Sequence, residues 1–288
     1  MRGGTFVPTC QSVMLGWSVR FSVKFGSTDG VLKMHKPPVF YVLIQVKFNT
    51  IQMARYVEDF LEALRRSGYP DYSEDTQTEM RVVMGPDGPR QFEQYPRKRW
   101  QFLNRERTEG FTLLEDALIY HTNRYENFSR CRAETLKALE ILHKQVTLDY
   151  VDRVGMRYLD AIVPLGGLSL ADLVKPALLG PGGDLPGKLE QGFSETRKAV
   201  DGGGLVLRTL VNEHALVIPP DLQNQTLSLS PDLRELRGTN MLVDTDYFVE
   251  RRFAFDLQAV AAQLDSSRAV LVGTFKGIIT EKAQQLWL

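Results

Sequence analysis

The most regular feature of the chain is the alternation of apolar and polar residues in its first half. Apolar side chains occupy every second position from Phe40 to Phe48. Successive side chains of a strand point to opposite faces, so this pattern predicts a strand with one buried face. Further strands are expected at 100–107, 111–125, 150–163 and 240–253, where β-branched and aromatic residues gather between turn-forming residues.

Helical spacing of apolar residues separates these expected strands. It predicts helices over 51–64, 128–146 and 256–286, with a short helix over 169–179. Glycine and proline gather in three stretches that favour turns or linkers, at 85–89, 180–187 and 201–204. The last of these suits a hairpin turn between two strands.

The order of these elements predicts an α+β fold of antiparallel sheets covered by long helices. Residues 37–166 read strand, helix, two or three strands, helix and strand, as in a split βαβ sandwich. Residues 167–288 form a second half with a strand meander and a final helix, and the halves meet near 164–168. Each half pairs a meander with a long helix, so a duplication of one unit remains an alternative. Residues 1–36 form an N-terminal extension.

This extension has two interpretations. Its apolar residues alternate from Val13 to Phe25, which predicts an extra strand. The alternative is that translation begins at Met34 rather than Met1, so that the stretch lies upstream of the true start.

Composition excludes several classes of protein. Lys and Arg together number 35, as do Asp and Glu, so bulk charge does not hold the chain on nucleic acid, although a local patch remains open. Two cysteines, Cys10 and Cys131, are too few for a disulfide framework and too far apart for a metal knuckle. Without an apolar run of about 18 to 20 residues we expect no membrane partner and a cytoplasmic protein.

Several short segments resemble one family of proteins. The most specific is Arg153-Val154-Gly155-Met156-Arg157-Tyr158, followed by Leu159-Asp160. This stretch is similar to the Arg-x-Gly-x-Arg-Tyr motif of a sporadically distributed family of uncharacterised bacterial proteins of about 250 residues, in which Asn usually stands at the position of Asp160. Segments at 37–39, 99–103, 244–247 and 278–281 also fit. The resemblance runs from Pro37 to the C-terminus and implies a bacterial, often mobile gene neighbourhood, without an established activity.

One local departure from neutrality lies between Arg90 and Arg107. Guanidinium groups pair with phosphates and aromatic rings stack on unpaired bases, so this composition suits single-stranded nucleic acid. The alternative is an ordinary amphipathic strand with its aromatic residues buried. The candidate residues for binding nucleic acid or a partner are Arg97, Lys98, Arg99, Trp100, Arg105 and Arg107, joined by Arg153 and Arg157 if their strand lies nearby.

Arg153 and Arg157 also have a structural interpretation. Four residues apart on a strand, they point to one face, where a buried pairing with carboxylates would organise the two halves. Asp244 and Asp246 likewise share a face and could hold Mg²⁺, but the solvated face of a half-buried strand explains them better.

Catalytic and cofactor motifs are missing from the sequence. The four histidines are scattered, and neither glycine-rich stretch matches a phosphate or dinucleotide loop. We therefore expect no catalytic residue, cofactor or metal, and the sequence favours a protein that is not an enzyme over one that is. The leading hypothesis is a non-enzymatic binding or adaptor protein in a bacterial multi-component system, associated with defence, whose protein partner is encoded nearby. The alternatives are a nucleic-acid-binding module and a metal-dependent phosphoesterase.

Overall fold

The computed structural model describes residues 38–85, 88–183, 185–222, 227 and 230–287, with side chains except those of 79–95 and 182–183. The expected N-terminal extension, 1–36, lies outside these residues, as does the question of a start at Met1 or Met34. Among the described residues, no helix combines the length and apolar character that a membrane crossing requires.

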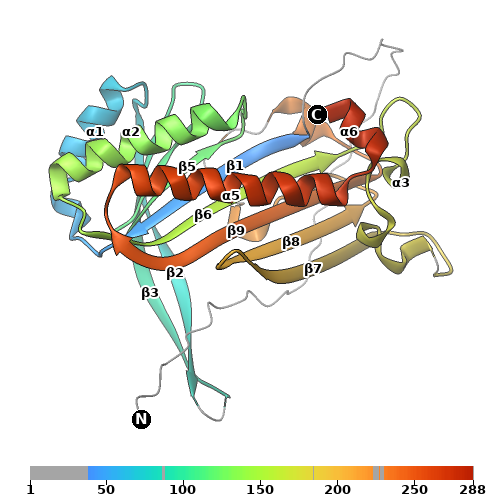
Figure 1. Cartoon of the computed structure of the whole chain (residues 1–288), viewed down its shortest axis with the longest axis horizontal. Coiled ribbons are helices and arrows are strands. Elements are labelled where there is room, and N and C mark those ends of the chain that lie inside the picture. Colours follow the sequence, from blue (N-terminus) through green and yellow to red (C-terminus); the bar gives the residue numbers. More distant parts are fainter. Residues whose placement is uncertain (1–37, 86–87, 184, 223–226, 228–229, 288) are drawn as a thin grey trace.

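The strands of the described residues form one antiparallel sheet, which confirms the α+β class (Figure 1). Their order across the sheet is β2-β3-β4-β5-β1-β6-β9-β8-β7. The strands are β1 (Val39–Phe48), β2 (Asp71–Gly85), β3 (Gly88–Leu103), β4 (Glu109–Leu113), β5 (Ala117–Thr122), β6 (Tyr150–Ile162), β7 (Gln191–Val200), β8 (Gly203–Asn212) and β9 (Asn240–Ala254).

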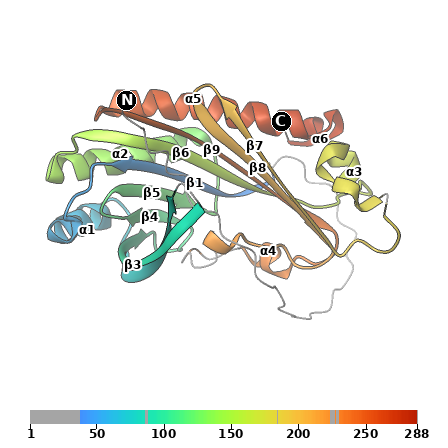
Figure 2. The same ribbon diagram turned by 90° about the horizontal axis from the view of Figure 1, so that it is seen from below.

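Helices cover one face of this sheet, as the edge-on view in Figure 2 shows. Asn127 caps α2 by accepting a hydrogen bond from the Arg130 amide, and Asp256 caps α5 in the same way. The longer helices are α1 (Val57–Arg66), α2 (Phe128–Val146) and α5 (Leu257–Ile278), and the shorter ones are α3 (Leu170–Leu173), α4 (Pro231–Glu235) and α6 (Glu281–Trp287).

The main core lies between the sheet and helices α1, α2 and α5. Strand β1 shows how the alternation builds it, because Val42, Ile44 and Val46 are fully buried there while Gln45 and Lys47 point to the other face. Large side chains from the other elements complete this core, among them Phe60, Trp100, Phe102, Tyr120, Leu139 and Tyr247.

The face opposite these helices is covered only at one end. Tyr41, Leu159 and Leu242 lie there beneath Leu216 and Leu222, which belong to the connection between β8 and β9. Figure 2 shows α4 of that connection on the side of the sheet away from α5. The rest of this face, which we call the open face, carries polar side chains.

Several predicted elements are confirmed. The helix at 128–146 and the strands at 40–48, 150–163 and 240–253 are present within a residue or two, and the turn at 201–202 joins β7 to β8.

The structure also differs from the predictions. No element was predicted for 71–84, which together with Gly85 forms strand β2, and β3 begins at Gly88, within the stretch 85–89 that was expected to favour a turn or linker. The expected strand at 111–125 is two strands, β4 and β5. The expected helix at 256–286 divides into α5 and α6 at Ile279 and Thr280. Strands from 37–166 and 167–288 join in one sheet through the pairing of β6 with β9.

Candidate interaction surface on the open face

Charged side chains occupy the open face at the centre of the sheet. They alternate with the core residues of the same strands, so the pattern that buries one face places the charges on the other. They are Lys47 on β1, Arg153 and Arg157 on β6, Asp244, Asp246 and Glu250 on β9, and Arg208 on β8, with Gln45 among them.

Arg157 and Asp244 form a buried, two-pronged ion pair at the middle of this face. The Arg157 Nε and Nη2 atoms each lie 2.7 Å from one oxygen of the Asp244 carboxylate. Asp244 is 1% exposed, so the pair is shielded from water. The two strands are neighbours in the sheet, and the pair therefore links the segment before residue 166 to the segment after it.

Two more charged groups complete this cluster. Arg208 donates from Nη1 to the Asp244 carboxylate at 3.2 Å, and Asp221, in the connection between β8 and β9, makes a close ion pair with Arg157. Burial alone would lower the pKa of Arg157, but the hydrogen bonds and charges of Asp244 and Asp221 raise it above its ordinary value. Arg157 therefore stays charged, and the cluster is a paired network.

Arg153 lies on the same face of β6 as Arg157, and its ion pair is longer than that of Arg157 with Asp244. Its guanidinium stacks on the Phe248 ring at 4.5 Å, contacts the Gln45 side chain and lies 3.6 Å from the Glu250 carboxylate. Burial lowers the pKa of Arg153. Burial likewise raises the pKa of Asp246, although Arg153 and Arg157 act against it.

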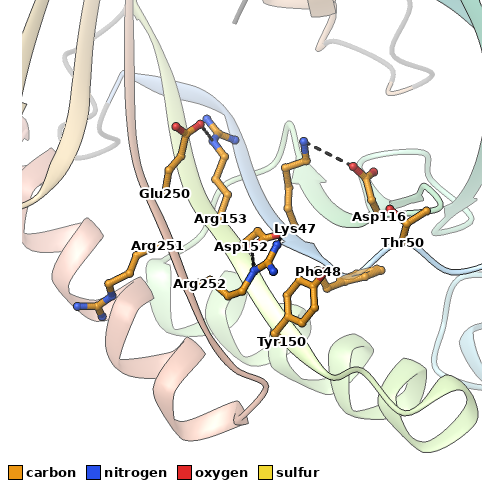
Figure 3. A pocket seen from close by; sticks show the side chains of 10 residues that line it. All are labelled: Lys47, Phe48, Thr50, Asp116, Tyr150, Asp152, Arg153, Glu250, Arg251 and Arg252. Carbon is orange, nitrogen blue, oxygen red and sulfur yellow. Dashed lines mark hydrogen bonds and ion pairs between the residues drawn. The ribbon is translucent and has the colours of Figure 1, made fainter. Parts of the chain in front are cut away.

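A hollow of about 410 Å³ opens beside Arg153 at one end of the face (Figure 3). Three ion pairs line it. The Lys47 and Asp116 side chains lie 3.5 Å apart, those of Arg153 and Glu250 3.6 Å apart, and those of Arg252 and Asp152 2.6 Å apart.

Two aromatic residues, Phe48 and Tyr150, are among those that line this hollow. The Arg252 guanidinium lies 4.0 Å from the centre of the Tyr150 ring, and Phe48 is next to it (Figure 3). Arg251 also borders the hollow, but its side chain points away from the others in Figure 3. Since the remaining cations are each matched to a carboxylate, the hollow is mixed in charge rather than strongly positive.

The structure separates the candidate residues of β3. Arg97 contacts Asp116 on the open face, whereas Trp100 is 2% exposed and lies in the core beneath the helices. Arg99 is buried and makes a two-pronged pair with Asp75 of β2. The Trp100 ring is therefore covered by protein and has no free face on which a base could stack.

The other candidates of this segment lie elsewhere. Lys98 is exposed on the side of β3 that Trp100 shares, and Arg105 is exposed in the turn between β3 and β4. Arg107, in the same turn, donates to Asp71 at 2.5 Å. The structure does not bring these residues together with Arg153 and Arg157 as one basic surface. The side chains between 90 and 95 lie outside those that it describes.

The remaining candidate reagents are held in structural roles. Within the described part of the chain, no group of three His, Cys, Asp or Glu residues could hold a metal ion. Burial lowers the pKa of His121 to about 4, helped by Arg99, and burial raises the pKa of Cys131 to about 11. His121 is thus neutral and Cys131 a protonated thiol, so neither is poised for catalysis at neutral pH.

Sequence reasoning identified one half of several pairs on this face. Arg153 and Arg157 stood out by their spacing, but Asp116, Asp221 and Arg208 did not. Asp116 and Asp221 lie in connections between strands and Arg208 lies on β8, so the fold, and not the spacing in the sequence, brings each of them to its partner. The sequence feature that could have indicated this face is the set of polar positions that alternate with the apolar core positions on β1 and β8.

Comparison of the chain with protein-family models, with curated proteins and with solved structures gives no match. The resemblance based on the motif at 153–160 therefore stays a prediction. What the arrangement can do chemically follows from its own groups. It presents arginine, tyrosine and carboxylate side chains on a broad, partly hollowed surface, the kinds of group that form polar contacts between proteins.

Proposed function

We propose that this protein is a non-catalytic binding protein that holds a protein partner on the open face of its sheet. The observation that carries the proposal is the hollow beside Arg153, where Arg153 and Arg252 are each matched to a carboxylate and stacked on an aromatic ring. Arginine and tyrosine dominate the energetics of many protein interfaces, because they combine apolar area with directed hydrogen bonds.

Charge balance favours a protein partner over nucleic acid. Binding to a phosphate backbone requires cations that release counterions, whereas Lys47, Arg153 and Arg252 are each paired within the chain. A partner protein with its own mixed charges can exchange contacts with such pairs without leaving unpaired charge.

A phosphoesterase centred on Asp244 and Asp246 is the weaker alternative. Both oxygens of Asp244 already accept hydrogen bonds from Arg157, and Arg208 adds a third donor. A divalent cation placed there would lie next to these guanidinium charges and be repelled by them.

The wider setting rests on the family resemblance. It supports a partner encoded next to this chain, within a bacterial multi-component system linked to defence. The protein then acts as an adaptor, with the open face as its contact surface.

Co-purification tests this proposal directly. The tagged chain is co-expressed with each neighbouring gene product, purified with and without nuclease, and compared with a variant carrying Arg153→Glu and Arg252→Glu. A matched control, Arg65→Glu with Arg66→Glu, makes the same change of net charge on α1, on the far side of the sheet.

We expect one neighbour to stay bound after nuclease treatment, to be lost from the open-face variant and to be kept by the control. Loss of the partner on nuclease treatment would instead favour nucleic-acid binding, as would a salt-dependent shift of single-stranded RNA or DNA. Equal retention by both variants would show that the open face is not the contact surface.

A further inference from the structure

The outer strand β7 forms an edge of the sheet, where the short helix η3 (Gly180–Gly183) is its neighbour outside the ladder. All its residues are exposed except Gly192 and Val200, which are half-buried, and Phe193 is 49% exposed. No described residue other than those of β8 forms a backbone ladder with it. An edge of this length offers an unsatisfied row of backbone groups for another strand.

The turn between β7 and β8 determines which backbone groups face outward. Asp201 and Gly202 have φ angles of 47° and 75°, as in a two-residue hairpin turn whose flanking residues, Val200 and Gly203, form a hydrogen-bonded pair. Hydrogen bonding alternates along an antiparallel ladder. The N–H and C=O groups of the odd-numbered residues 193, 195, 197 and 199 therefore point away from β8.

The sequence of β7 is complementary to itself about Thr196. Antiparallel pairing of two copies with Thr196 opposite Thr196 places Glu195 of one copy opposite Arg197 of the other, twice over. Opposite charges on directly facing residues stabilise a ladder, and like charges destabilise it. The same register places the exposed Phe193 opposite Ala199, so an apolar ring gains an apolar neighbour.

Other registers are less favourable. Hydrogen bonding requires an outward-facing residue to meet another outward-facing residue, so the symmetry axis must pass through a residue. An axis through position 195 places glutamate opposite glutamate, and one through 197 places arginine opposite arginine. In the described part of the opposite edge strand, β2, the charged side chains are all carboxylates, Asp71, Glu74 and Asp75, so that strand offers no opposite charges to a second copy of itself.

We propose that two copies of this chain join edge to edge through β7, in the register centred on Thr196. Glu195 now accepts hydrogen bonds from Arg197 and Arg208 of its own chain, at 2.9 and 2.7 Å. In the pair, the facing Arg197 replaces the first contact while Arg208 keeps the second. The symmetry axis is perpendicular to the sheet, so the helices of both copies lie on one side and both open faces on the other.

Sedimentation velocity of the purified chain over a wide range of concentrations tests this pairing without any partner protein. We expect a dimer that grows with concentration, and monomers for Glu195→Lys and for Arg197→Glu, because each substitution places like charges opposite one another. An equimolar mixture of the two variants should recover the dimer, since the introduced lysine then faces the introduced glutamate. Arg197→Pro, which removes an outward N–H together with the guanidinium that faces Glu195, should also be monomeric.

The matched control is Lys198→Glu, which changes net charge as Arg197→Glu does but faces Ser194 across the axis, and should dimerise like the unmodified chain. A monomer at every concentration would overturn the proposal. So would dimerisation of both single charge variants, or a mixture of folded variants that stays monomeric. Because no partner takes part, these results stand apart from the outcome of the co-purification.

Discussion

A buried carboxyl group beneath α5 should make a contribution to the stability of the protein that is lost as pH rises. Asp160 is 5% exposed on the helix-covered face of β6, opposite Val39 on β1 and Val243 on β9. Burial raises its pKa from 3.8 to about 7, while the positive charge of Arg268 on α5 acts in the opposite direction. Asp160 also stands where the resembling family usually has Asn.

The sign and size of the effect follow from this shift. Between pH 4 and pH 7 the unfolded chain has released the proton of Asp160 while the folded chain still holds it, so the free energy of unfolding falls as pH rises. One pH unit is worth about 1.4 kcal/mol, and the whole interval costs the folded state on the order of 4 kcal/mol, reached above about pH 7.

Asp160→Asn removes the ionisation and keeps the shape. We expect the variant to match the unmodified chain near pH 4 and to be more stable by a few kcal/mol at pH 8, measured by urea unfolding at several pH values. Asp59→Asn, on the exposed surface of α1, is the control and should change stability little at either pH. Parallel pH profiles for Asp160→Asn and the unmodified chain would refute the reasoning.

Three further outcomes follow from buried groups. Arg157→Met leaves the Asp244 carboxylate buried with one fewer cation, and urea unfolding should show a loss of about 3 to 5 kcal/mol, most of it recovered when Asp244→Asn is added. Because the folded-state pKa of His121 is lowered to about 4, the contribution of His121 to stability is lost as pH drops from 6.5 to 4, opposite in sign to that of Asp160, and the stability of His121→Phe relative to the unmodified chain should rise over that interval in unfolding curves. Gly203→Ala would place a methyl group 2.5 Å from the Phe248 carbonyl oxygen, so thermal unfolding should show a lower Tm.

Each of these outcomes has a contrary result. An Arg157→Met chain as stable as the unmodified one would mean that the Asp244 charge is solvated. If the stability of His121→Phe changes with pH as that of the unmodified chain does, the loss of stability in acid arises from groups other than His121. An unchanged Tm for Gly203→Ala would show that the β8 backbone can shift away from β9.

The strands and helices were predictable where one face is apolar and the other polar. Val42, Ile44 and Val46 predicted β1, and the same alternation correctly placed Asp244 and Asp246 on one face of β9. The expectation that this face is solvated was wrong for Asp244, which is 1% exposed and paired with Arg157. Strand β2 was not predicted because its first eight residues, 71–78, are almost all polar. An edge strand can consist mostly of polar residues, because it buries few side chains on either face.

The open face was predictable only in part, for a different reason. Spacing along one strand shows that Arg153 and Arg157 share a face, and their pairing with carboxylates was an open alternative. Which carboxylate meets which arginine depends on register between strands far apart in sequence, as for Arg157 with Asp244, 87 residues away. Alternation within a strand carries no information on such partners.

The place of β6 at the centre of the sheet has a consequence for how the chain is made. Its partner β9 is among the last segments to be synthesised. During translation β6 can pair with β1, but the edge of β6 that will pair with β9 stays unpaired. Contacts between such distant segments slow folding, and a ribosome-bound or truncated chain ending before Asn240 would expose that edge to aggregation. Full-length synthesis is therefore what protects the nascent protein from self-association.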